Sequence, residues 1–76
     1  MKNVEGAACN LAFGNFIQEK RKSKGLSQMD VATSIGLTQS YFSRLESGER
    51  SADLAIAINL FRKLDVNPME FFSRYL

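Results

Sequence analysis

Apolar residues recur every three or four positions along the chain, which is the spacing of a helix that buries one face. Phe13, Phe16 and Ile17 predict such a helix over residues 11–24, and Gly25 ends it as a terminal glycine. Residues 1–10 precede this helix. We expect them to form a mobile N-terminal arm ahead of a single domain over residues 11–76.

Two short helices are predicted next, in the middle of the chain. Ser27 and Asp30 have the spacing of a capping box, which starts the second helix, and Gly36 ends it. Thr38 is a suitable N-cap for a third helix over residues 39–47, which Gly48 ends. The connection spans only residues 36–38. A short turn with a glycine makes the two helices cross steeply, as in a helix-turn-helix over residues 27–47.

The C-terminal third predicts two more helices. The fourth begins at Ser51 or Ala52 and runs to about residue 64, and the motif of residues 67–70 is typical of a fifth helix start. Strand-like alternation never extends beyond a few residues, so the fold class is all-α, a compact domain of five short helices. The predicted buried stripe of the fourth helix comprises Leu54, Ala57, Ile58, Phe61 and Leu64.

The third helix has an apolar side and a polar side. Phe42 and Leu45 predict its buried side. No acidic residue lies between Thr38 and Leu45, where a carboxylate would repel DNA phosphates. Glutamine pairs well with the edge of adenine in a major groove, and arginine pairs with guanine. The alternative is an ordinary solvated surface helix, which more often carries Lys and Glu. The polar side comprises Gln39, Ser40, Ser43, Arg44 and Ser47.

Two stretches of the chain resemble a known family. RKSKGLSQMDVA begins at Arg21 and GLTQSYFSRLESG begins at Gly36. Together they are similar to the lambda-repressor-like, Cro/C1-type (XRE) helix-turn-helix family of transcriptional regulators. The similarity covers roughly residues 13–72 and rests on many spaced positions, so it is more specific than a single short motif.

The resemblance implies a role for each matching residue. Gln28 matches a position that clamps a DNA phosphate, and Ser43 and Ser47 match positions that approach the DNA backbone. Arg21 and Glu46 match a structural ion pair that ties the first helix to the third. Lys20 stands where the family usually has an apolar residue, so the first helix is expected to pack less tightly there. The positions that reach base edges are Thr38, Gln39, Ser40 and Arg44.

The basic residues are concentrated in the middle of the chain. The net charge of +2 is uninformative by itself, but residues 20–50 carry six basic and three acidic side chains. Lys24 ends the first predicted helix and Arg50 follows the third, and both are candidate phosphate contacts. The alternative is a solvated helix end, where a cation favours the C-terminal dipole.

Apolar residues crowd the C-terminus. They are too many for one face of a short helix, so we assign Phe71 to the core and Phe72, Tyr75 and Leu76 to a dimer patch. One short recognition helix gives too little affinity alone. We therefore expect a homodimeric transcriptional regulator that binds double-stranded DNA at a pseudo-palindromic operator. The alternative is a protein-interaction module on the same scaffold, of antitoxin or anti-regulator type.

Other functions have little support in the sequence. With no histidine and only Cys9 for cysteine, neither a metal site nor an internal disulfide is expected. Nothing pairs a nucleophile with a base, so an enzyme is the weakest interpretation, and no cofactor or small-molecule ligand is expected. The longest apolar stretch, residues 54–58, is far too short to span a membrane, and no signal-peptide pattern begins the chain. We expect a cytoplasmic, nucleoid-associated protein.

Overall fold

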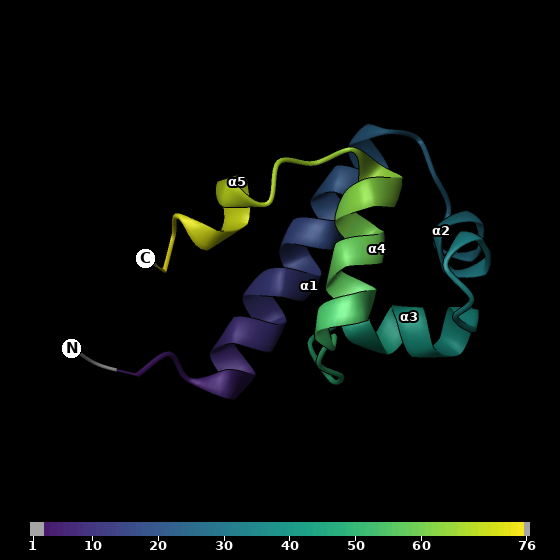
Figure 1. The fold of residues 1–76 in the computed structure, drawn as a ribbon. Coiled ribbons are helices and arrows are strands. Elements are labelled where there is room, and N and C mark those ends of the chain that lie inside the picture. Colours follow the sequence, from purple (N-terminus) through teal and green to yellow (C-terminus); the bar gives the residue numbers. More distant parts are fainter. Residues whose placement is uncertain (1–2, 76) are drawn as a thin grey trace.

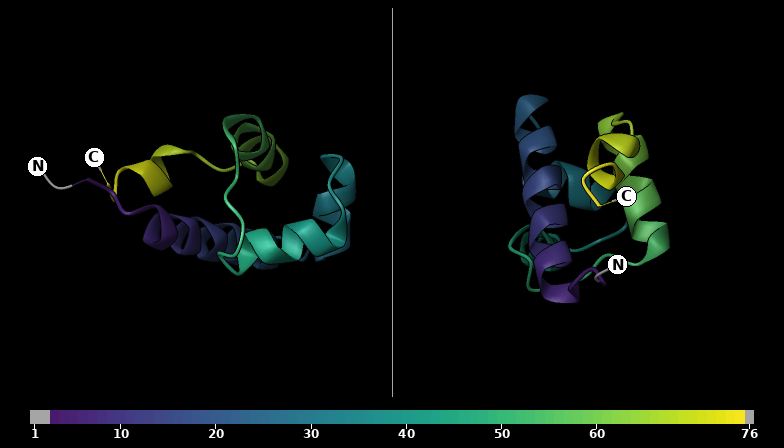
Figure 2. Two further views of the ribbon diagram at one scale, coloured as in Figure 1. Left: turned by 90° about the horizontal axis from the view of Figure 1, so that it is seen from below. Right: turned by 90° about the vertical axis from the view of Figure 1, so that its left-hand side faces the viewer.

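The computed structural model describes residues 3–75, and all of its regular structure is helical (Figure 1). The five-helix, all-α prediction is confirmed. The first and fourth helices lie along each other, and the second and third form the end of the molecule that is opposite both termini (Figure 2). No helix in residues 3–75 is long and apolar enough to cross a membrane. The helices are α1 (Gly6–Ser23), α2 (Gln28–Ser34), α3 (Gln39–Glu46), α4 (Leu54–Leu64) and α5 (Met69–Phe72).

The helix-turn-helix is defined by local capping bonds. Ser27 and Asp30 form the predicted capping box, with bonds of 3.0 and 3.1 Å between each side chain and the other residue's backbone N–H. Thr38 Oγ1 accepts a hydrogen bond from the Tyr41 N–H at 3.1 Å and so begins α3. Gly36 lies between the helices with a φ of 75°, which a residue with a Cβ adopts only with strain. α2 and α3 therefore begin where predicted, although α3 ends at Glu46, one residue before the predicted end, and the two helices cross steeply (Figure 1).

Two helix starts differ from the prediction. α1 begins at Gly6 rather than at residue 11, so residues 6–10 belong to the helix and not to an arm. Ala7 and Ala8 are strong helix formers, which explains the longer helix. α4 begins later than predicted, at Leu54, because Asp53 Oδ1 accepts a hydrogen bond from the Ile56 N–H at 2.8 Å and acts as its cap.

The core lies where α1, α3 and α4 meet. The buried stripe of α4 is rotated from the prediction, because Leu60 is fully buried while Leu54 and Ile58 are 75% and 41% exposed. α4 is apolar around most of its circumference, so its sequence fits more than one stripe and the neighbouring helices decide between them. The buried apolar residues are Phe13, Phe16, Ile17, Val31, Ala32, Phe42, Leu45, Leu60, Phe61, Leu64 and Phe71.

A glycine inside α1 allows α1 and α3 to approach closely. A Cβ built on Gly14 would lie 2.5 Å from the carbonyl oxygens of both Leu45 and Glu46. Neither oxygen belongs to a flexible side chain, so the clash could be relieved only by separating the two helices. Gly14 is thus required by this crossing, and it holds the C-terminal end of α3 against α1.

α5 is attached to α1 by aromatic and ionic contacts. The ring of Phe71 lies 5.4 Å from the rings of both Phe13 and Phe16. The Lys20 ammonium forms an ion pair with the Glu70 carboxylate and lies 5.4 Å from the centre of the Phe16 ring. Looser packing was expected at Lys20. Instead, its cation connects α1 to the C-terminal helix through these two contacts.

Candidate nucleic-acid interface

α3 presents one polar face to solvent. Phe42 and Leu45 are fully buried, and Glu46 is only 3% exposed. No acidic side chain of α3 therefore reaches the surface, because its one carboxylate points into the protein. This geometry gives a helix with an exposed face of hydrogen-bonding groups and one cation, at one end of the molecule. The exposed residues are Thr38, Gln39, Ser40, Ser43, Arg44 and Ser47.

The residues of this face differ in how far their polar groups are already engaged. The Thr38 oxygen caps α3 but keeps its hydrogen and its methyl group for other contacts. Ser47 Oγ donates to the Arg44 carbonyl oxygen at 3.0 Å, so this hydroxyl must rotate before it can donate elsewhere. Among residues 3–75 the Arg44 guanidinium has no carboxylate partner. Arg44 is therefore a cation that an anionic or polar ligand can engage without breaking an ion pair.

A buried ionic network holds α3 against α1. Arg21 Nε donates to Glu46 Oε2 at 2.7 Å, and Arg21 Nη2 donates to Glu46 Oε1 at 3.0 Å. Arg21 Nη1 donates to the Leu26 carbonyl oxygen at 2.8 Å, in the turn before α2. The ion pair that the family resemblance implied is thus present, and its two parallel bonds give it a defined geometry.

The network also includes Gln28, for which the sequence suggested only a phosphate contact. Gln28 Nε2 donates to Glu46 Oε1 at 2.9 Å. The sequence interpretation assigned Gln28 to a phosphate and paired Glu46 with Arg21 alone. Residues 28 and 46 are far apart in the chain, and no sequence pattern connects them. Only the folded arrangement of α2 and α3 shows that one carboxylate serves both partners.

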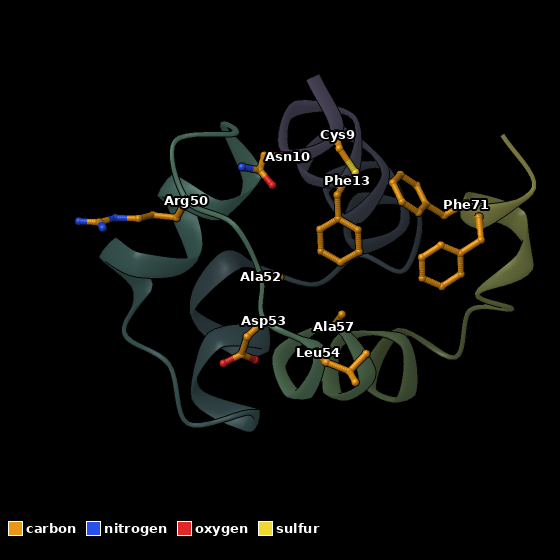
Figure 3. Close-up of a pocket in the computed structure, with 10 residues that line it drawn as sticks. Cys9, Asn10, Phe13, Arg50, Ala52, Asp53, Leu54, Ala57 and Phe71 are labelled. Carbon is orange, nitrogen blue, oxygen red and sulfur yellow. The ribbon is translucent and has the colours of Figure 1, made fainter. Parts of the chain in front are cut away.

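The loop after α3 is folded back on that helix. The backbone N–H groups of Glu49 and Arg50 donate to the Arg44 carbonyl oxygen at 2.9 and 3.3 Å. The Tyr41 hydroxyl donates to the Ser51 carbonyl oxygen at 3.3 Å. These bonds fix the backbone on both sides of Arg50, whose exposed side chain points away from the body of the protein (Figure 3). Sequence reasoning missed the anchoring role of Tyr41.

The remaining basic residues are distributed unevenly. Lys24 is exposed at the C-terminal end of α1, next to the start of the turn that leads to α2. Lys20 is on the same helix, but its ammonium is paired with the Glu70 carboxylate. Lys24 is therefore more available than Lys20 to an anionic ligand.

The carboxyl of Asp30, near the start of α2, has a lowered pKa. Hydrogen bonds from the backbone of Ser27, and then from its side chain, stabilise the ionised form.

These features are those of a helix-turn-helix protein, and the comparison with known proteins agrees. The helix-turn-helix family matches residues 17–71, so the chain belongs to this family of DNA-binding transcriptional regulators. It is 34% identical over 64 residues to the control protein C.MunI of Mycoplasma sp., with 83% of this chain and 86% of that protein covered. The matched proteins are regulators, not enzymes.

Two solved structures share the fold. The restriction-modification controller protein C.AhdI of Aeromonas hydrophila superimposes with a TM-score of 0.78 and 38% identity, over 86% of this chain and 98% of that one. An HTH_3 family transcriptional regulator of Vibrio cholerae gives a TM-score of 0.80 at 24% identity, over 93% of this chain and 40% of that one. The second similarity shows the fold alone.

Proposed function

We propose that this protein is a sequence-specific regulator that binds double-stranded DNA as a homodimer, with α3 in the major groove. The observation that carries the proposal is the exposed face of α3, which is polar, free of acids and held outward by its buried side. A major groove is roughly 12 Å wide and accepts an α-helix. Two copies would read the halves of a pseudo-palindrome, about 34 Å apart.

The polar face divides the proposed DNA contacts into two kinds. Base contacts are assigned to Thr38, Gln39, Ser40 and Arg44, because all four are exposed and match the family positions that reach base edges. Phosphate contacts surround them. Tyr41 supports one of these contacts indirectly, since it anchors the loop that carries Arg50. The proposed phosphate contacts are Gln28, Ser43, Ser47, Arg50 and Lys24.

The homodimer is proposed to form at exposed apolar residues of α4 and α5. Leu54 is 75% exposed, and together with Phe13 it lines an open groove of about 280 Å³ (Figure 3), which Phe72 also lines. Ile58, one turn further along α4, is also exposed, as is Tyr75 at the end of the chain. Aromatic and aliphatic residues of this kind are typical of interface cores.

We therefore propose a larger dimer patch than the C-terminal residues alone suggested. Phe72 and Tyr75 are exposed, while Leu76 lies outside the described residues. Phe71 is 2% exposed and belongs to the core, as predicted. The exposed residues of α4 extend the patch across two helices, and a surface of this breadth suits a second copy of the chain better than a small ligand.

The relatives support a narrower proposal. C.AhdI is a restriction-modification controller protein and C.MunI is a control protein. We infer that this chain is a controller of the same type, which regulates transcription by occupying an operator. The proposal rests on the similarity over most of each chain, whereas the operator sequence depends on contacts that side-chain identity alone does not determine.

Selection of bound duplexes from a random pool tests the proposed function. We expect recovery of a pseudo-palindrome whose affinity falls steeply as salt rises, because phosphate contacts release counterions. The control is a scrambled duplex of the same composition at the same salt. Uniform binding to all duplexes would contradict sequence-specific recognition. A stoichiometric protein partner without salt-sensitive DNA binding would favour the interaction-module alternative.

Light scattering during size exclusion tests the dimer. Leu54→Asp is expected to shift the protein toward monomer, because it places a charge in the proposed interface. Met29→Asp is the matched control, since Met29 is also an exposed apolar residue in the first turn of a helix, α2. An acid is compatible with the first turn of either helix. Equal behaviour of the two variants would remove the α4–α5 patch as the interface.

A further inference from the structure

We propose that Glu46 is a positioning residue for DNA binding, which acts by orienting the Gln28 side chain. The inference rests on the proposed function, in which Gln28 contacts a phosphate. It assigns the buried carboxylate of α3 a role in addition to its ion pair with Arg21. The route is the hydrogen bond from Gln28 Nε2 to Glu46 Oε1, which joins α2 to α3 at 2.9 Å.

The carboxylate of Glu46 is held rigidly. Its two oxygens accept two bonds from Arg21 and one from Gln28, and its side chain is 2% exposed. Arg21 is fixed in turn by its bond to the Leu26 carbonyl oxygen. Three segments of the chain, α1, the following turn and α3, therefore hold this acceptor in place before any ligand arrives.

A carboxylate selects one orientation of an amide. An ionised carboxylate only accepts hydrogen bonds, so the amide of Gln28 must present its nitrogen to Glu46 and not its oxygen. The amide nitrogen carries two hydrogens, and the bond to Glu46 uses one of them. The second hydrogen diverges from the first in the plane of the amide. Gln28 is half-buried, and its amide nitrogen makes no second hydrogen bond among residues 3–75. In the proposal, this second hydrogen is the donor to a phosphate oxygen.

This arrangement prepares the donor before DNA binds. Ordering a free glutamine side chain on binding costs rotamer entropy. Here that order is present in the free protein, because Glu46 holds the amide. Glu46 also belongs to α3, so the phosphate contact of α2 and the base contacts of α3 are fixed relative to one another.

A double-mutant cycle separates this role from simple support of the fold. Affinity for the selected duplex is measured for the wild type, Glu46→Gln, Gln28→Leu and the double variant. We expect Glu46→Gln to weaken binding about fivefold when Gln28 is present, as for one lost hydrogen bond. In the Gln28→Leu background the same change should weaken binding less than twofold. Thermal unfolding of all four proteins shows how far Glu46→Gln disturbs the ion pair with Arg21. We expect this disturbance to be similar with Gln28 and with Leu at position 28.

Each outcome decides the proposal. An equal loss of affinity in both backgrounds would overturn it, since Glu46 would then act through the fold alone. Wild-type affinity of Gln28→Leu would also overturn it, while the proposed function would stand as long as the wild type binds its duplex. If the wild type binds no duplex specifically, the proposed function itself fails. The three failures are therefore distinguishable.

A measurement on the unmodified protein covers the case in which Glu46→Gln does not fold. Nuclear magnetic resonance distinguishes the two hydrogens of each glutamine side chain. One hydrogen of Gln28 is expected to exchange with water several-fold more slowly than either hydrogen of Gln39. Gln39 is the internal control because its side chain is exposed on α3. Similar fast exchange at both residues would show that Glu46 does not hold Gln28 and would overturn the proposal.

Discussion

The α2–α3 end of the molecule and the α4–α5 side achieve their structures in different ways. At the α2–α3 end, the helix starts are capped by neighbouring side chains, and the buried carboxylate has a full set of partners. On the α4–α5 side, large apolar residues remain exposed and α5 is a single short turn of four residues. The first region is complete as a rigid surface for a ligand. In the proposed homodimer, a second copy of the chain would cover the exposed apolar residues of the second region.

Two residues of α4 test this comparison with the largest expected effect. Leu60→Ala should lower the free energy of unfolding by about 3 kcal/mol, because Leu60 is fully buried and its loss leaves a cavity. Ile58→Ala, two residues earlier on the exposed side, should change the stability of the monomer little and weaken the dimer instead. Chemical denaturation at low protein concentration measures the first effect. A larger stability loss for Ile58→Ala would restore the stripe predicted from the sequence.

Gly14→Ala tests the close crossing that supports the α2–α3 end. We expect a loss of about 2–3 kcal/mol in the free energy of unfolding, since the added methyl group would overlap two backbone carbonyls. Gly6→Ala is the control, because a Cβ at Gly6 meets nothing within 4 Å. Thermal unfolding compares the two. If both variants were equally stable, α1 and α3 would not be as close as described.

Arg44→Ala tests the face that α3 presents. It should weaken binding to the selected duplex by about 1–3 kcal/mol and relax the preference at one base position, with the free energy of unfolding unchanged. Binding isotherms on the selected duplex and on single-base variants measure both effects. An equal loss on every sequence would instead identify Arg44 as a phosphate contact.

The smallest expected effect concerns the capping box of α2. The pKa of Asp30 is lowered from its ordinary value of 3.8, so its ionised form stabilises the folded state at higher pH. This contribution is fully present above the unfolded pKa, and it is lost as pH falls from there through the lower folded pKa. Asp30→Asn should flatten the pH dependence of stability in that acidic range only. An unchanged acid profile of unfolding would show that Asp30 makes no such contribution.

The accuracy of the sequence predictions also differs between the two regions. The capping residues of α2 and α3 and the buried side of α3 were confirmed, because these features depend on contacts within a few residues. The stripe of α4 was right for Phe61 and Leu64 but wrong for Leu54 and Ile58, which are exposed while Leu60 is buried in their place. As side chains, Leu54, Ile58 and Leu60 are equally suited to burial. The phosphate and base contacts stay predictions, since they are contacts with a separate molecule and not contacts within the chain.

The sequence by itself determined the five-helix organisation, the short turn between α2 and α3 and the polar face of α3. Each of these follows from caps, glycines and spacing that act locally. The tertiary structure alone decided which side of α4 is buried, why Gly14 lies within a helix and how Gln28 meets Glu46. These features join residues that are distant in the chain. Their geometry exists only once α1, α2, α3 and α4 pack together, so no local pattern could specify it.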